Sequence, residues 1–173
     1  GIREAQLDMT DRHSITAEPI SAAAFAPFGS VLEAPSDFGR RYYDSGLANE
    51  RPSARCSLSV SRIAPTPDFP LTAIEMERHE FSSQSFIPMD VSRYLIVVAP
   101  HLPAGTPDTR QARAFIVPGD VGITYGADVW HHPIAVLDRP GRFAIVMWAD
   151  GTDRDEEFVR LEHPFEIILP RDK

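Results

Sequence analysis

Two small groups of residues stand out because their side chains bind metal ions or transfer protons. His131 and His132 are adjacent in the run 129–133, VWHHP, while Glu77 and His79 lie in an earlier strand-like run that is followed by Gln84. Successive side chains of a strand point to opposite faces. Only one of His131 and His132 can therefore face the interior of a barrel, whereas Glu77 and His79 share a face. The sequence predicts two polar clusters, on separate strands, that meet inside a β-barrel.

These residue types suit acid–base or metal chemistry. Histidine changes its charge near neutral pH, so we expect His79, His131, His132 and Glu77 to be catalytic. Imidazole and amide groups also suit a divalent metal such as nickel, zinc or manganese. We therefore expect His79, Gln84 and one of the adjacent histidines, with His131 favoured, as metal ligands, and Glu77 as a further ligand or a base. The same side chains could also work without a metal.

Short strands must position these residues. The chain has 16 prolines scattered between short apolar runs, which disfavours long helices. About ten short strands with turn signals between them are typical of an all-β sandwich or barrel. We expect one short helix at 22–25, capped by Ser21, and another that starts at Thr152 or Asp153 and runs to Phe158. The expected strands are 15–20, 30–33, 56–63, 71–79, 85–88, 94–99, 114–117, 122–125, 129–137, 143–148 and 165–169.

Length, charge and cysteine content narrow the class of protein. The 173 residues suit one domain, expected at 15–173 after a flexible N-terminus at 1–14. The formal net charge of −8 argues against binding to nucleic acid, and the lack of a long apolar run argues against a membrane span or a signal peptide. The single cysteine, Cys56, is expected to be buried in a strand. We therefore expect a cytoplasmic protein.

Two motifs resemble those of the cupin superfamily. The run 117–126, a turn followed by a strand and a glycine, leads to the histidine pair as the second cupin motif leads to its histidine. The spacing from Glu77 to His79 and on to Gln84 resembles the first cupin motif, with Glu77 where that motif has its first histidine. The resemblance implies an all-β fold, the cupin-type double-stranded β-helix (jelly-roll barrel), with a few short helices.

Longer segments resemble the ureidoglycolate lyase family. They cover 71–72, 75–79, 84–89, 113–116 and 122–133, within a resemblance that spans about 15–148. The resemblance implies a homodimeric cupin enzyme of allantoin (purine) breakdown that splits ureidoglycolate into glyoxylate and urea. In the run 41–44, RYYD, Tyr43 stands where the family pattern has a histidine, so the substrate contacts of this loop stay open.

A small carboxylate substrate calls for a bidentate arginine. Arg41, Arg62 and Arg93 are the candidates, and Gln84 and Tyr125 are expected to line the pocket. Two other functions stay open: a cupin isomerase or hydrolase that acts on another small hydroxy acid or a uronate, and a cupin that binds a small acid without catalysis.

Several of these residues also have purely structural interpretations. His132 could be a core histidine, Glu77 could pair with Arg78 or a cross-strand arginine, Gln84 could bond a turn, and Tyr125 could be a barrel-wall aromatic. The apolar run 165–170 could pair with a second copy across a two-fold axis or pack on its own barrel.

Overall fold

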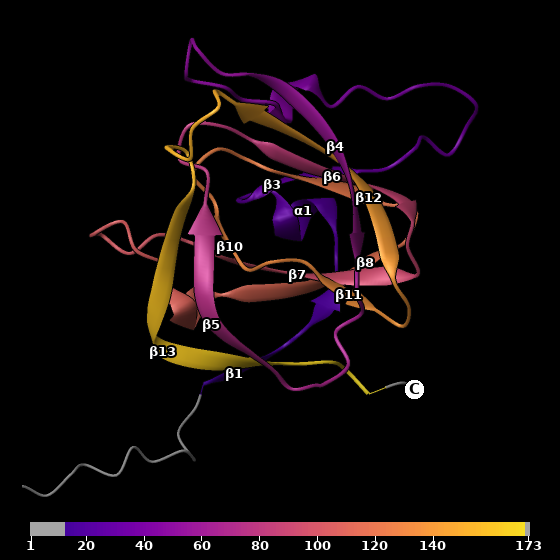
Figure 1. The fold of residues 1–173 in the computed structure, drawn as a ribbon. Helices are drawn as coiled ribbons and strands as arrows, with labels where there is room; N and C mark the ends of the chain where they lie inside the picture. The colour runs from indigo at the N-terminus through magenta and orange to yellow at the C-terminus, as the bar shows by residue number, and fades with distance from the viewer. Residues whose placement is uncertain (1–12, 172–173) are drawn as a thin grey trace, which may run out of the picture.

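Strands make up most of the regular structure. The computed structural model describes residues 13–171 (Figure 1). Its short helices are α1 (Ala22–Phe25) and the 3-10 helices η1 (Asp44–Gly46) and η2 (Thr109–Gln111). The strands are β1 (Ser14–Thr16), β2 (Glu18–Pro19), β3 (Gly29–Leu32), β4 (Arg55–Ile63), β5 (Leu71–Arg78), β6 (Gln84–Asp90), β7 (Arg93–Ala99), β8 (Arg113–Pro118), β9 (Gly122–Tyr125), β10 (Trp130–His131), β11 (Ala135–Leu137), β12 (Gly141–Ala149) and β13 (Glu157–Ile168).

The strands form two facing sheets. The larger sheet has the order β1-β13-β5-β10-β7-β8-β2, with β11 also paired to β7, and the smaller has the order β3-β9-β6-β12-β4. Strands distant in the chain are neighbours, as β13 is to β5 and β12 to β4. Most pairs are antiparallel, while β1 and β2 run parallel to their partners. The predicted all-β jelly-roll barrel of cupin type, with a few short helices, is confirmed.

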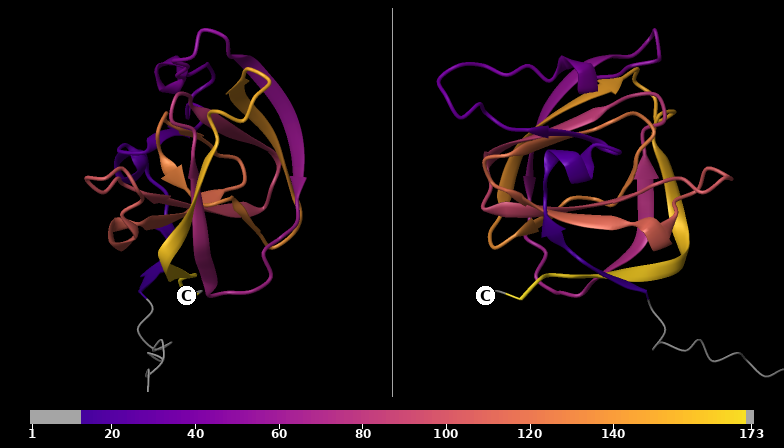
Figure 2. Two further views of the ribbon diagram at one scale, coloured as in Figure 1. Left: turned by 60° about the vertical axis from the view of Figure 1, so that its left-hand side comes forward. Right: turned by 180° about the vertical axis from the view of Figure 1, so that it is seen from behind.

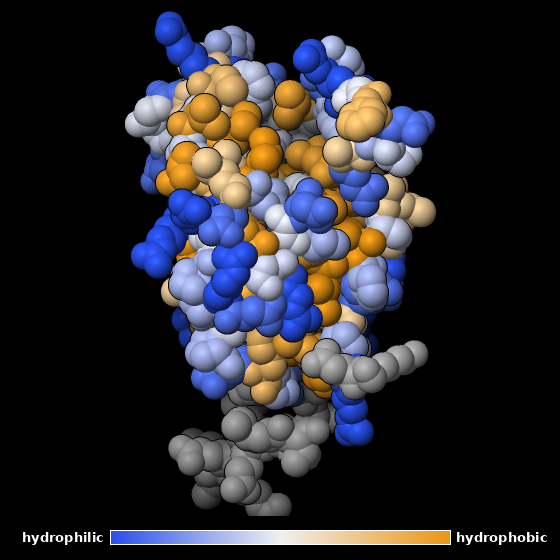
Figure 3. All heavy atoms as spheres, turned by 90° about the vertical axis from the view of Figure 1, so that its right-hand side faces the viewer, coloured by the Kyte–Doolittle hydropathy of each residue, from blue (hydrophilic) through white to orange (hydrophobic). Residues whose placement is uncertain are grey.

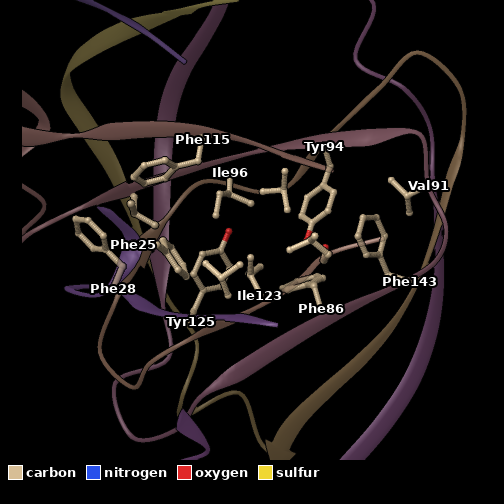
Figure 4. Packing of buried hydrophobic residues seen from close by; sticks show 14 of the residues in the cluster. Phe25, Phe28, Phe86, Val91, Tyr94, Ile96, Phe115, Ile123, Tyr125 and Phe143 are labelled. Atoms are coloured by element: carbon tan, nitrogen blue, oxygen red, sulfur yellow. The ribbon is translucent and has the colours of Figure 1, made fainter. Parts of the chain in front are cut away.

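The aromatic core fills the space between the two sheets (Figure 4). Alternate residues of β7 supply it: Tyr94, Ile96 and Val98 face this core and are fully buried. Phe25 of α1 packs in this core, and the Ser21 hydroxyl accepts the Ala24 N–H at 3.1 Å and caps the helix as predicted.

A second apolar cluster lies on the other face of β7. Leu95 and Val97 pack there with Phe165 and Ile167 of β13, which bends and runs beside β1 (Figure 1). Both edges of this part of β13 are occupied, by β1 on one side and β5 on the other. The idea that the run 165–170 pairs with a second copy is therefore wrong, and its alternative, packing on its own barrel, is confirmed.

Four local predictions fail, one of them the expected strand 15–20, which is divided into β1 and β2. The expected helix from Thr152 to Phe158 is absent, because that segment bends and then enters β13, where Glu157 pairs with Arg78. The expected strand 129–137 is divided into β10 and β11, since the chain leaves the ladder at Pro133, which has no N–H to donate. Cys56 is exposed rather than buried, because its face of β4 points outward.

The two described ends of the chain lie at one end of the barrel, and the segment 33–50 projects at the other (Figure 2). Of the predicted N-terminal segment 1–14, residues 1–12 lie outside the described residues, and Ser14 already begins β1. Within the described chain no helix has the length and apolarity needed to cross a membrane.

Candidate active site

The predicted polar residues come from both sheets. In the larger sheet, His131 of β10 is the cross-strand partner of Glu77 in β5. In the smaller sheet, Gln84, the first residue of β6, is the partner of Tyr125, the last residue of β9. His79 follows the end of β5 directly. Strand pairing thus places His131 beside Glu77 and Gln84 beside Tyr125. These two cross-strand pairs meet at one end of the barrel.

Ring contacts join the two pairs into one cluster. The Tyr125 ring stacks on the His131 imidazole, with centroids 4.2 Å apart and planes inclined by 12°. The imidazoles of His79 and His131 lie 5.7 Å apart, and Glu77 Oε1 lies 3.4 Å from His131 Nε2. His79, Gln84, Tyr125 and His131 are all buried, so these side chains act on each other with little screening by water.

The turn between β9 and β10 holds the cluster in register. Asp128 has a positive φ of 65°, a conformation that aspartate tolerates better than most residues, and its N–H donates to the His79 carbonyl at 2.8 Å. Its carboxylate accepts from Arg78 Nη1 at 2.8 Å, and the Arg78 guanidinium lies over the Trp130 ring at 4.7 Å. Arg78 therefore pairs with Asp128 and with Glu157, not with Glu77. The neighbours of His79 and His131 are fixed on both strands.

Four buried polar atoms of the cluster have no hydrogen-bond partner within residues 13–171. They are His79 Nε2, His131 Nε2, Gln84 Oε1 and the Tyr125 hydroxyl. The His131 Nδ1 lies 2.9 Å from the Val129 carbonyl and donates a hydrogen bond to it, so Nε2 is the ring nitrogen that faces the cluster. Buried polar atoms are nearly always paired. Four unpaired atoms in one cluster indicate a place for a ligand.

The same atoms suit a metal ion. The donor atoms of Glu77, His79 and His131 all lie within 4.8 Å of one another. Two imidazole nitrogens and a carboxylate oxygen are a common ligand set for first-row divalent metals. The Val129 carbonyl also gives His131 the outer hydrogen bond that metal-binding histidines usually make. The residues therefore fit a divalent cation.

Burial and charge set the protonation of the cluster. Burial and the neighbouring His131 lower the pKa of His79, against the opposing effect of Glu77 and Asp155. Burial would raise the pKa of Glu77, but its interactions with His131 and His79 outweigh that effect and lower it. Burial raises the pKa of Tyr125 well above its ordinary value. At neutral pH the cluster therefore holds a charged Glu77, a neutral His79 and a neutral Tyr125 hydroxyl.

His132 lies beside the cluster rather than in it. Its side chain is half-buried, its Nδ1 lies 2.9 Å from the Pro133 carbonyl, and burial lowers its pKa. The charges of Glu75 and Glu77 act on it in the opposite direction. Of the two adjacent histidines, His131 is therefore the one whose nitrogen meets Glu77 and His79.

The three predicted arginines lie elsewhere. Arg93 pairs with Asp138 through Nε at 2.9 Å, five residues along β7 from Val98, the partner of His131, or about 16 Å by strand rise. Arg62 lines a surface hollow of about 450 Å³ with Arg139 and Arg142. Arg41 is exposed in the segment before η1. None of them forms a described contact with the cluster.

The structure adds residues near His79 that the sequence interpretation missed. Asp155 is buried, accepts a hydrogen bond from Ser82, and lies 3.5 Å from the Arg51 guanidinium. Gln84 Nε2 lies 3.9 Å from the Met147 sulfur. Asp155 stands in the acidic run 153–157, whose composition gives no sign that one member is buried.

Comparison with known proteins assigns the family. Residues 12–168 match the family model described as ureidoglycolate lyase. The chain belongs to the ureidoglycolate lyase family. Proteins named ureidoglycolate lyase from Azotobacter vinelandii and Mesorhizobium japonicum are 39% and 35% identical to it. The alignments cover 83% of this chain and 91% of the first relative, and 90% and 98% for the second.

A third relative of the same name, from Brucella melitensis biotype 2, is 34% identical over 89% of this chain and 94% of its own length. Among solved structures, a dTDP sugar isomerase from Desulfovibrio desulfuricans G20 aligns with a TM-score of 0.45 and 16% identity, over 79% of this chain and 83% of that chain. That likeness is too weak to bear on function. The family model and the named relatives support an enzyme with lyase activity.

Proposed function

We propose that this enzyme is a ureidoglycolate lyase that splits ureidoglycolate into glyoxylate and urea in the breakdown of allantoin. One observation of the structure supports this most directly. In a chain of this family, one cluster contains four buried polar atoms without hydrogen-bond partners in the described residues, and they belong to His79, Gln84, Tyr125 and His131. Ureidoglycolate is a small polar acid, and it could satisfy these atoms on binding.

The reaction needs two proton transfers at one carbon, which carries a hydroxyl, a carboxylate and a ureido nitrogen. A base removes the hydroxyl proton, the oxygen electrons form the aldehyde C=O bond, and the C–N bond breaks. The departing nitrogen takes up a proton, so the catalytic groups are unchanged after one cycle. Glu77, charged at neutral pH, and the neutral imidazoles of His79 and His132 can accept the first proton and return it to urea. His131 holds its neighbours in place through Glu77 and Tyr125.

Glu77, His79 and His131, with Gln84 as a further ligand, would hold a nickel, zinc or manganese ion. Such an ion would polarise the substrate oxygens and lower the pKa of the hydroxyl. In a metal-free enzyme the same residues would bind the substrate and transfer its proton directly. The Tyr125 hydroxyl would bind a substrate oxygen in both cases, and the Gln84 amide would bind the substrate in the metal-free enzyme.

Release of glyoxylate from racemic ureidoglycolate tests the function. The enzyme is stripped with a chelator and then supplied with nickel, zinc or manganese. Turnover that disappears on stripping and returns with one metal supports both the reaction and the metal site. Turnover that survives stripping supports the lyase without a metal. No turnover under any condition, or full turnover by the His79→Ala variant, would refute the proposal.

The substrate carboxylate needs a cation, and Arg41 is the predicted arginine best placed to supply one. The segment that follows Arg41 returns to the site, since Ala48 N donates to Ser83 Oγ at 2.9 Å and Asn49 bridges Ser82. Arg62 and Arg93 belong to the other end of their strands. Arg62 is opposite Arg142, which pairs with Asp90, six residues along β6 from Gln84, or about 20 Å.

We also propose that the enzyme is a cytoplasmic homodimer. The outer face of the smaller sheet exposes Leu58, Val60, Ile87 and Met89, whose exposed fractions are 72%, 64%, 42% and 61% (Figure 3). Val60 and Ile87 flank Ala144 on adjacent strands, so these side chains form one surface. A second copy would cover this surface and the edge strand β4.

Size measurement tests the dimer. Val60→Asp places a charge in the proposed interface and is expected to give a monomer. Ile74→Asp, at an exposed position of β5, is the control and should leave the dimer intact. A wild-type protein that runs as a monomer would refute the homodimer.

A further inference from the structure

Asp155 is a carboxylate in an unusual place. It is 6% exposed, while Thr152, Asp153 and Arg154 before it and Glu156 after it are exposed, in a segment without regular secondary structure. Burying a charged carboxylate is unfavourable unless close partners compensate for the lost water. Each partner of Asp155 should therefore show what the buried charge holds in place.

The side chain of Asp155 hydrogen-bonds to the turn at Phe81 and Ser82. Its Oδ1 accepts the Phe81 N–H at 2.8 Å, and its Oδ2 accepts the Ser82 hydroxyl. Phe81 and Ser82 lie in the connection between β5 and β6, which has His79 at its start and Gln84 at its end. The Asp155 carboxylate therefore fixes the short connection that joins two proposed ligands, His79 and Gln84, although Asp155 lies more than seventy residues further along the sequence.

The main chain of Asp155 hydrogen-bonds to His79 itself. Its carbonyl hydrogen-bonds the His79 ring, and His79 Nε2 is the ring nitrogen that stays unpaired. This bond gives His79 the same arrangement that the Val129 carbonyl gives His131. One nitrogen of each ring is held by a carbonyl, and the other faces the cluster.

Asp155 is in turn anchored from outside the site. Arg51 Nη2 lies 3.5 Å from its Oδ2, and Arg51 Nη1 lies 3.0 Å from Asp150 at the end of β12. Two residues after Asp155, Glu157 begins β13 and accepts from Arg78 Nε at 2.7 Å. Asp155 is thus held by Arg51 on one side and by the start of β13 on the other. It can therefore hold the turn at Phe81 and Ser82 in a fixed position.

From these contacts we propose that Asp155 is a positioning residue: it sets the separation of His79 and Gln84 and fixes the tautomer that presents His79 Nε2 to Glu77 and His131. It touches neither substrate nor metal. The inference rests on the proposed function only in assuming that the site is used for catalysis. The geometry that Asp155 controls can be measured without substrate.

Two readouts that need no substrate test this role in the whole protein. Chelator-stripped protein is titrated with Ni²⁺ alone, with Zn²⁺ and Mn²⁺ as further probes, and the tautomer of His79 in the metal-free protein is read from its ¹⁵N chemical shifts. Asp155→Ala removes the side-chain bonds to Phe81 and Ser82 that hold residue 155 against the turn, so its main-chain carbonyl should no longer stay in place beside His79. It should therefore weaken metal binding by about 10–100-fold, as loss of an outer-shell partner does, and should give His79 a mixture of tautomers. Asp155→Asn should retain part of both properties, since its amide oxygen can still accept the Phe81 N–H.

Asp153→Ala is the matched control, because Asp153 is exposed in the same bend, and it should leave both readouts unchanged. If Asp155→Ala does not fold, Asp155→Asn and Ser82→Ala carry the test. A lowered unfolding midpoint with wild-type metal affinity and wild-type tautomer would show that Asp155 is merely structural, and would overturn the proposal. If the wild type binds none of the metals, the tautomer alone decides. Lack of ureidoglycolate turnover by the wild type would refute the proposed function but not this inference.

Discussion

Tyr125 offers a substitution whose effects on stability and activity should have opposite signs. Its hydroxyl is buried and has no hydrogen-bond partner among residues 13–171, while its ring stacks on His131. An unpaired buried hydroxyl destabilises a protein by about 1–3 kcal/mol. Tyr125→Phe keeps the ring and removes the unpaired group, so it should stabilise the substrate-free protein.

The lower end of that range gives a conservative magnitude. About 1 kcal/mol corresponds to a rise in Tm of about 2–4 °C for a chain of this length. If the hydroxyl binds a substrate oxygen, its loss should lower kcat/KM by about tenfold, which is the effect of one good hydrogen bond. Thermal unfolding followed by circular dichroism and a glyoxylate-release assay measure the two effects on the same preparation.

Tyr94→Phe is the matched control in the same aromatic core. The Tyr94 hydroxyl is also buried, but it donates to the Val121 carbonyl at 2.6 Å. Its removal leaves a carbonyl without that donor, so it should lower Tm and leave kcat/KM unchanged. The reasoning about the site would be refuted if Tyr125→Phe lowered Tm as Tyr94→Phe does, or if it left turnover at the wild-type level.

Two further predictions concern charge. First, burial lowers the pKa of both His79 and His132 below 6.5, so as pH falls through 6.5 the unfolded chain takes up protons before the folded one. The metal-free protein should therefore lose stability progressively from pH 6.5 downward; urea unfolding at several pH values would measure this, and a flat profile over this window in wild type would contradict it. Second, Arg41→Ala should raise KM about tenfold or more by removing a charged partner of the carboxylate, whereas Arg62→Ala should not. Steady-state kinetics of the two variants would decide, and equal KM values would exclude Arg41 from substrate binding.

Spacing in the sequence could predict the centre of the site because strands impose it. The period of two puts Glu77 and His79 on one face, and the turn signals around Gln84 and Tyr125 place these residues at strand ends. What spacing could not supply is the partner of each strand. The pairing of β10 with β5 puts His131 opposite Glu77, and it depends on the whole barrel.

Long-range contacts explain why the helix predicted near residue 155 is absent and why the burial of Asp155 was missed. The acidic run 153–157 has the composition of a helix start, yet pairing of Glu157 with Arg78 draws the chain into β13. The same run contains one buried carboxylate, that of Asp155. Its composition could not reveal this burial, because the partners of Asp155 are the distant residues Phe81, Ser82 and Arg51. Local propensity is a weak preference that tertiary pairing overrides.

The exposed position of Cys56 shows a different limit. The apolar residues of β4 alternate with polar ones, with Cys56, Leu58 and Val60 on one face. Alternation shows that a strand has two different faces, but the more apolar face need not be the one that meets the core of the same chain. In β4, Leu58 and Val60 point outward, beside Val146 and Ala144 of β12. A strand that is patterned for burial and left exposed is what a surface completed by a second copy requires, so the failed prediction for Cys56 supports the proposed dimer.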